Sequence, residues 1–195
     1  GVGKTSMAIA FSQAMDLSYK RMQFTPDVMP SDVTGYTMYD RNSGKNVYIP
    51  GAAMCNLFLA DEINRTSSKT QSALLEVMEE GSITVDGVTR QVPQPYLVIA
   101  TQNPIGSAGT QPLPESQMDR FIVRLSMGYP DKQSEMEMLR RRQPGSHSGR
   151  IQTVVTPQEL REMQQEVESI FVSEPLYKYI TDLASWTRMQ PAIRL

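Results

Sequence analysis

The sequence is poor in cysteine, in net charge and in long apolar runs. Its single cysteine, Cys55, excludes a disulfide within the chain and favours a reducing compartment, for which we expect the cytoplasm. A formal net charge of -2 gives no electrostatic case for nucleic acid as a partner. No apolar stretch approaches the roughly 18 residues that cross a bilayer, and no signal peptide is recognisable. We therefore expect no membrane span and no nucleic-acid partner.

The remaining composition is that of a folded protein of ordinary size. Of the 195 residues, 39% are hydrophobic and 21% are charged, which predicts one globular domain, or a larger and a smaller one. The chain begins at Gly1 with no initiator methionine and no strand before its first motif. We expect it to be incomplete at this end, and also beyond Leu195.

One short stretch combines a buried strand with two adjacent carboxylates. Residues 56–60 read Asn-Leu-Phe-Leu-Ala and run directly into Asp61 and Glu62. A short, mostly apolar run predicts a strand buried on both faces, as in the middle of a parallel sheet. The two acids would then lie at the carboxyl edge of that sheet, where ligands of open α/β folds bind. Taken alone, the pair fits a solvent-exposed loop equally well.

The first five residues, Gly-Val-Gly-Lys-Thr, form the second half of a phosphate-binding P-loop, G-x-x-x-x-G-K-[ST]. Glycines allow backbone N–H groups to curl around phosphate oxygens, and the following helix, expected over 6–15, directs its positive end at them. Lys4 would reach the β- and γ-phosphates, and the Thr5 hydroxyl would hold Mg²⁺. The motif predicts a nucleotide site at the start of the chain.

Apolar runs and helical spacings alternate along the rest of the sequence. Strands are expected at 19–24, 56–60, 96–100 and 121–125, the clearest helix at 67–80, and β-hairpins across 36–49 and 82–90. This alternation predicts an α/β fold with a doubly wound parallel sheet, and the two motifs make it a P-loop NTPase. From residue 131 the pattern is helical, so we expect an α/β domain over 1–130 and a small all-α unit over 131–195.

Five motifs closely resemble the MoxR family of AAA+ ATPases. They are QFTPD at 23–27, LADEINR at 59–65, VDGV at 85–88, IATQNP at 99–104 and LPESQMDRF at 113–121. The resemblance extends over nearly the whole chain. It implies that residues 1–130 are an AAA+ nucleotide-binding core and that residues 131–195 are its helical lid.

The resemblance implies a nucleotide site with bound Mg²⁺. Lys4 and Thr5 correspond to the Walker A pair, and Asp61 corresponds to the Walker B carboxylate that orders the Mg²⁺ shell. The cofactors would be ATP and Mg²⁺, with Thr5 and Asp61 as the residues on the metal. The nucleotide-binding residues would be Gly1, Val2, Gly3, Lys4, Thr5, Ser6 and Asp61.

Three further residues match catalytic positions of the family. Glu62 corresponds to the base that polarises the attacking water, and Asn103 to the sensor 1 residue, although Asn103 could be only a turn residue. Arg120 corresponds to the arginine finger, which acts on ATP held by a neighbouring subunit. Arg124 is the next candidate for the finger, and Arg120 could instead pair with a nearby acid. Arg65 could contact nucleotide across the interface between subunits, but we expect it to form a surface salt bridge.

The resemblance also implies partners. Residues 31–50 resemble the helix-2 insert, and 81–92 the pre-sensor 1 hairpin, of the AAA+ branch that contains magnesium chelatase. A finger that acts between subunits implies a ring of copies of this chain, commonly a hexamer. MoxR-type rings remodel or activate protein clients, including metal-cofactor insertion, often beside proteins with von Willebrand A domains.

Two other functions stay open at this point. One is a nucleotide-gated scaffold in which ATP only sets ring assembly; such a scaffold would need none of Glu62, Asn103 and Arg120. The other is a magnesium-chelatase-like subunit that drives metal insertion directly. We assign no sensor 2 role to Arg188 or Arg194.

Overall fold

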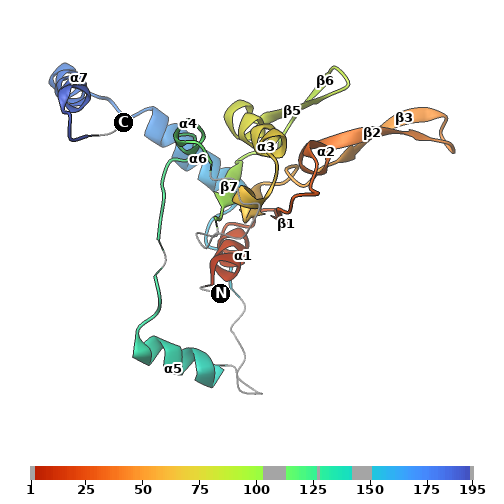
Figure 1. Ribbon diagram of the computed structural model, residues 1–195, viewed down its shortest axis with the longest axis horizontal. Coiled ribbons are helices and arrows are strands. Elements are labelled where there is room, and N and C mark those ends of the chain that lie inside the picture. The colour runs from red at the N-terminus through yellow and green to blue at the C-terminus, as the bar shows by residue number, and fades with distance from the viewer. Residues whose placement is uncertain (1–2, 103–112, 127, 142–150, 194–195) are drawn as a thin grey trace. The chain divides into compact units, whose positions relative to one another are not determined.

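The computed structural model describes residues 3–102, 113–126, 128–141 and 151–193 (Figure 1). The chain divides into two units, Gly1–Leu160 and Arg161–Leu195. The predicted boundary between core and lid, after residue 130, stays a prediction. None of the described helices is long and apolar enough to span a membrane.

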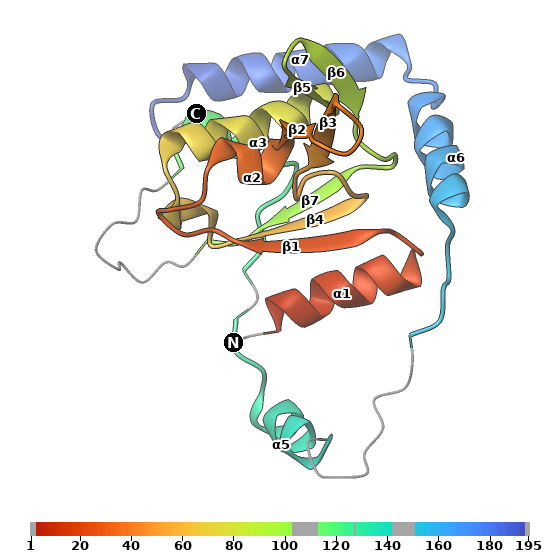
Figure 2. The same cartoon turned by 90° about the vertical axis from the view of Figure 1, so that its right-hand side faces the viewer.

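A three-stranded parallel sheet positions the two motifs. Its strands are β1 (Tyr19–Gln23), β4 (Leu57–Asp61) and β7 (Leu97–Ala100), in the order β1-β4-β7. Helix α1 (Lys4–Ala14) covers one face, and α2 (Pro30–Thr34) and α3 (Ser68–Glu80) cover the other (Figure 2). A parallel sheet with helices on both faces confirms the predicted α/β class.

Strand β4 is buried on both faces because its apolar residues alternate between two cores. Leu57 and Leu59 pack with Ala8 and Leu17 on the α1 side. Phe58 and Ala60 belong to the larger cluster on the other side. Each fully buried Leu or Phe side chain contributes about 1.5–3 kcal/mol, so the central strand is firmly held up to its last residue, Asp61.

The side chain of Asn56 joins the amino ends of all three strands. Its Oδ1 accepts hydrogen bonds from the Ser18 backbone N–H (3.3 Å) and hydroxyl (2.7 Å), just before β1. Its Nδ2 donates to the carbonyl of Pro95, just before β7, at 3.1 Å. One residue ahead of β4 therefore fixes where both neighbouring strands begin.

The two predicted hairpins form as separate antiparallel pairs. They are β2 (Gly35–Asp40) with β3 (Lys45–Pro50), and β5 (Ser82–Val85) with β6 (Val88–Gln91). The turn of the second is Asp86-Gly87, whose φ values of 51° and 74° are those of the tight turn that Asp-Gly favours. The guanidinium of Arg90 lies 4.0 Å from the ring centre of Tyr48, so a cation–π contact joins the hairpins.

Helix α3 matches the helix predicted over 67–80. The Ser67 hydroxyl caps its first turn by accepting from the Thr70 N–H at 3.3 Å. Gly81 ends it in the left-handed conformation, with φ 61°, and donates to the Val77 carbonyl. A 3₁₀ turn, η1 (Ile63–Arg65), connects β4 to this helix. The route from the Asp-Glu pair to the second hairpin is therefore short and regular.

The remaining helices are α4 (Glu115–Met118), α5 (Lys132–Arg141), α6 (Pro157–Glu168) and α7 (Glu174–Met189). Just before α6, the N–H groups of Val154 and Val155 donate to the Ala14 carbonyl at 2.7 and 3.1 Å. This segment therefore caps the end of α1, where carbonyls have no partner within the helix.

The strand predicted over residues 121–125 is wrong. Phe121 packs against the larger core, but Ile122 is fully exposed and this segment pairs with no strand of the described sheet. The apolar, β-branched residues of this segment favour a strand. A strand, however, forms only where a neighbour accepts and donates its backbone hydrogen bonds.

Cys55 is an inert core thiol, as its place before a buried strand predicts. It is 1% exposed, and burial raises the pKa of its thiol to about 11. The reactive species is the thiolate. We therefore expect no labelling of the folded protein by a thiol reagent at pH 8 and complete labelling in guanidinium chloride, measured by mass spectrometry. Rapid labelling of the folded protein would contradict this burial.

Candidate nucleotide site

The N-terminus of α1 meets the carboxyl end of the sheet. Gly3 precedes the helix with φ 85°, a left-handed conformation that favours glycine. The first N–H groups of the helix have no partner within it, so this end attracts anions. The ammonium of Lys4 donates to the Gln102 carbonyl, just beyond β7, at 3.4 Å. Gly1 and Val2 lie outside the described residues.

Asp61 ends β4 with each carboxylate oxygen already bound. Oδ1 accepts from the Thr101 hydroxyl at 2.5 Å. Oδ2 accepts from Nη2 and Nε of Arg21 at 2.6 and 3.2 Å. Burial alone would raise the pKa of Asp61, but the Thr101 hydroxyl, the Arg21 guanidinium and the Lys4 ammonium together hold it below its usual range. The side chain is 17% exposed and carries a negative charge at neutral pH.

Glu62 turns the chain out of the sheet. Its φ of 56° and ψ of 47° are left-handed, which costs a non-glycine residue on the order of 1 kcal/mol. Its N–H donates to the Thr101 hydroxyl oxygen at 2.9 Å. Its carboxylate pairs with Nη1 of Arg65 at 2.9 Å, so the expected salt bridge of Arg65 is confirmed and its partner is the predicted base.

Thr101 and Arg21 contact the acid pair, although neither was predicted to be a site residue. The Thr101 hydroxyl contacts both members of the acid pair, while Arg21 reaches Asp61 from the neighbouring strand. Thr101 directly follows β7 as Glu62 follows β4, and parallel strands end at the same edge. Strand alternation likewise places Arg21 on one face of β1. Both signals were present in the sequence.

The other predicted catalytic residues lie elsewhere or are not described. Asn103 lies outside the described residues. Arg120 follows α4, and its Nη1 contacts Oε2 of Glu79 on α3 at 3.1 Å, which is the pairing with a nearby acid that the sequence left open. Arg124 is exposed. Within this chain the structure therefore brings together Lys4, Asp61 and Glu62, but not Arg120.

The donors at this edge fit a hard cation such as Mg²⁺. Asp61 offers carboxylate oxygens, and Thr5, next to Lys4 in the first turn of α1, offers a hydroxyl. Among the described residues there is no group of three or more Asp, Glu, His or Cys that could hold a metal ion. A site with one carboxylate suits Mg²⁺, which commonly combines one or two carboxylates with phosphate oxygens and water.

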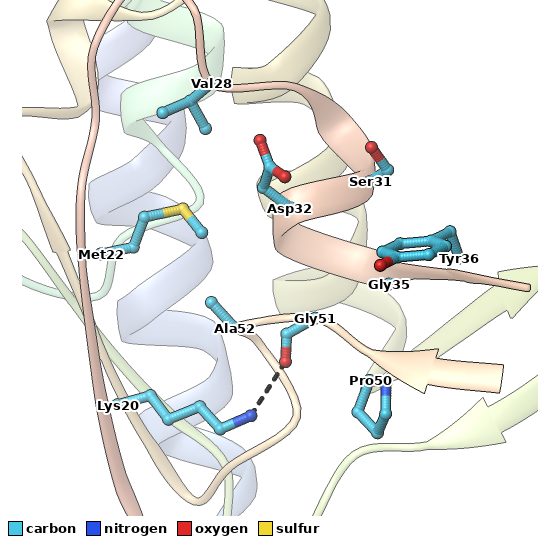
Figure 3. A pocket seen from close by; sticks show the side chains of 10 residues that line it. All are labelled: Lys20, Met22, Val28, Ser31, Asp32, Gly35, Tyr36, Pro50, Gly51 and Ala52. Atoms are coloured by element: carbon cyan, nitrogen blue, oxygen red, sulfur yellow. Dashed lines mark hydrogen bonds between the residues drawn. The ribbon is translucent and has the colours of Figure 1, made fainter. Parts of the chain in front are cut away.

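A separate pocket lies on the other side of β1. It has a volume of about 430 Å³ and is bounded by β1, α2 and the bases of β2 and β3 (Figure 3). Lys20, which follows Tyr19 and precedes Arg21, points into it and donates to the Gly51 carbonyl at 3.0 Å. None of the predicted site residues lines this pocket. Successive residues of β1 thus face different sites: Lys20 faces this pocket, and Arg21 faces Asp61.

Sequence comparisons identify related proteins along the whole chain. A family model described as "ATPase family associated with various cellular activities (AAA)" matches residues 1–123. The chain is 45% identical over 195 residues, all of its length, to the uncharacterised Bacillus subtilis (strain 168) protein YeaC, and covers 61% of it. It is 37% identical over 188 residues, 96% of its length, to chaperone MoxR1 of Mycobacterium tuberculosis, and covers 49% of it.

The fold gives the same result. A crystal structure of a candidate ATPase from Cytophaga hutchinsonii matches with a TM-score of 0.85 at 40% identity, covering 96% of this chain and 57% of that one. The chain therefore belongs to the AAA family of ATPases and, within that family, to its MoxR members. It spans about half to three-fifths of the length of these relatives.

Thr101→Val tests the hydroxyl that connects the acid pair. The change leaves the Asp61 carboxylate and the Glu62 N–H without this partner, so we expect a loss of about 1–3 kcal/mol in the free energy of unfolding. Urea denaturation followed by circular dichroism measures it. The matched control is Thr84→Val, because Thr84 also contacts a hydroxyl, that of Thr89 at 2.8 Å, but is exposed. Equal losses in the two variants would contradict the role of Thr101.

Proposed function

We propose that this chain is the nucleotide-binding part of a MoxR-type ATPase, which hydrolyses ATP in a ring of identical subunits to remodel or activate client proteins. The observation that supports this most is the meeting of Lys4 with the Asp61-Glu62 pair at one edge of the sheet. A cation for phosphate, a carboxylate for Mg²⁺ and a second carboxylate for water are the groups that phosphoryl transfer to water requires.

Each residue has a distinct role in this proposal. The N-terminal turn of α1, with Gly1, Val2, Gly3 and Ser6, binds phosphate oxygens through backbone N–H groups, and Lys4 binds the β- and γ-phosphates. Thr5 and Asp61 hold Mg²⁺, which neutralises charge on the phosphates when bound. Glu62 accepts a proton from the attacking water, and Asn103 orients that water.

Arg120 acts on the ATP of the neighbouring subunit. Its side chain is 41% exposed, which leaves the guanidinium accessible to another copy of the chain. An arginine supplied in this way can be worth about 10³–10⁵ in rate. Hydrolysis then depends on assembly, for which we propose a ring, commonly a hexamer in this superfamily.

The proposal also includes protein clients and a cytoplasmic location. A relative that covers nearly the whole chain is named a chaperone, which supports action on proteins. Clients with von Willebrand A domains, or metal-cofactor insertion, follow from the family resemblance alone. A cytoplasmic location rests on the single cysteine. The scaffold alternative predicts no steady-state release of phosphate, which an ATPase assay distinguishes.

Glu62→Gln tests the base in the full-length protein. The amide keeps the shape of the side chain but cannot accept the proton of water, so we expect ATP binding to persist and turnover to fall at least about 100-fold. Phosphate release and binding of a fluorescent ATP analogue measure the two effects. Glu76→Gln, an exposed acid on α3, is the control. Unchanged turnover in Glu62→Gln would refute the assignment.

Arg120→Ala tests whether the finger acts between subunits. Alone, the variant should lose nearly all activity, and so should Lys4→Ala. In mixed rings, a Lys4→Ala subunit can supply an intact Arg120 to the intact nucleotide site of an Arg120→Ala subunit, so activity should partly return. Mixing is verified by native mass spectrometry. Verified mixed rings without recovered phosphate release would count against the finger.

A further inference from the structure

Arg21 is a cation at the candidate metal carboxylate that no motif of the sequence includes. It lies in the middle of β1, where its register partner on β4 is Leu59. Both Nε and Nη2 of its guanidinium donate to the same atom, Oδ2 of Asp61. Nη2 also donates to Oε1 of Gln23, two residues along the same strand, at 2.8 Å. The guanidinium is therefore held at one oxygen by two donors and has a second acceptor beside it.

The two oxygens of Asp61 are unequally placed for a metal. Oδ1 is bound by a neutral hydroxyl, that of Thr101, and a hydroxyl adds no net charge. Oδ2 is bound by a full positive charge at 2.6 Å. A cation at this distance opposes a divalent cation at the same oxygen, because like charges repel strongly where water is partly excluded.

We propose that Arg21 competes with Mg²⁺ for Oδ2 of Asp61 and so sets the Mg²⁺ concentration at which the nucleotide site fills. Arg21 is a positioning residue in this role, since it acts through Asp61 and touches no substrate. The inference rests on the proposed function, which makes Asp61 the carboxylate of the metal shell. Arg21 then raises the Mg²⁺ concentration that the site needs above the concentration that Thr5 and Asp61 alone would require.

The surroundings of Arg21 allow it to give way. Its side chain is 43% exposed, so it can leave Oδ2 for water without burying its charge. Gln23 already accepts one of its N–H groups and can keep it near the site. With the guanidinium at Oδ2, Asp61 has a charged partner; with Mg²⁺ there, it has a stronger one. Asp61 is thus paired in both arrangements.

Arg21→Met in the full-length protein separates this competition from general electrostatics. Affinity for a fluorescent, non-hydrolysable ATP analogue is measured in EDTA and across a MgCl₂ titration. Without metal, loss of a positive charge should weaken or leave unchanged the binding of the anionic nucleotide. With metal, the Mg²⁺ concentration at half-saturation should fall about three- to tenfold, the size expected for one partly exposed charge.

Two variants serve as controls for charge and geometry. Lys20→Met removes one positive charge from the adjacent residue, whose ammonium binds the Gly51 carbonyl on the other side of β1, and should leave the Mg²⁺ half-saturation unchanged. Arg21→Lys keeps the charge but loses the second donor to Oδ2, so its Mg²⁺ half-saturation should lie between those of the parent protein and Arg21→Met. Arg21→Gln provides a polar replacement, with the same expectation as Arg21→Met, if the methionine variant does not fold.

The outcomes are distinguishable. A half-saturation that is unchanged or higher in Arg21→Met and Arg21→Gln, with a parent protein that responds to Mg²⁺, overturns the competition alone. An equal fall in Lys20→Met overturns it too, because the effect is then one of net charge. Nucleotide binding by the parent protein that does not depend on Mg²⁺ overturns both this inference and the proposed metal role of Asp61.

Discussion

The candidate site depends on the Thr101 hydroxyl, which lies between Oδ1 of Asp61 and the N–H of Glu62. The oxygen–oxygen distance to Asp61 is 2.5 Å, and the donor–acceptor distance from Glu62 is 2.9 Å. The hydroxyl therefore orients a carboxylate on one side and supports a left-handed residue on the other. Glu62 lies just beyond the strand, and its carboxylate pairs with Arg65, so the hydroxyl fixes the backbone of Glu62 and the carboxylate of Asp61. The connection holds them as one unit at the edge of the sheet.

Charge balance at this edge is local. Asp61 pairs with Arg21, and Glu62 pairs with Arg65, so each acid has its own arginine. The two arginines come from different places, one from the neighbouring strand and one from the 3₁₀ turn directly after the acids. Both are about 40% exposed, so each pair is only moderately strong. Such pairs hold the carboxylates in place at a modest gain in stability.

Much of this arrangement could be predicted from the sequence. The apolar run before Asp61, the hairpin across 82–90 and the helix at 67–80 all depend on local signals, and the structure confirms each of them. The contacts of Arg21 and Thr101 with Asp61, and the choice of Glu79 as the acid that pairs with Arg120, were not predicted, because each contact joins distant segments. The prediction of a strand at 121–125 was wrong for the same reason, because the local sequence does not determine whether a pairing partner is present. Sequence patterns indicate which residues reach an edge, whereas register decides which atoms meet there.

Side-chain hydrogen bonds at the far end of the sheet support that register. Asn56 ties the beginnings of β1 and β7 to its own strand, and five residues at about 3.3 Å each separate it from Asp61. Together with the backbone pairing of the strands, this amide helps to align a guanidinium, a carboxylate and a hydroxyl roughly 16 Å away. A slip of one residue in β1 would turn Lys20, not Arg21, toward Asp61. The position of the site residues at one edge of the sheet thus depends in part on the hydrogen bonds of Asn56 at the opposite edge.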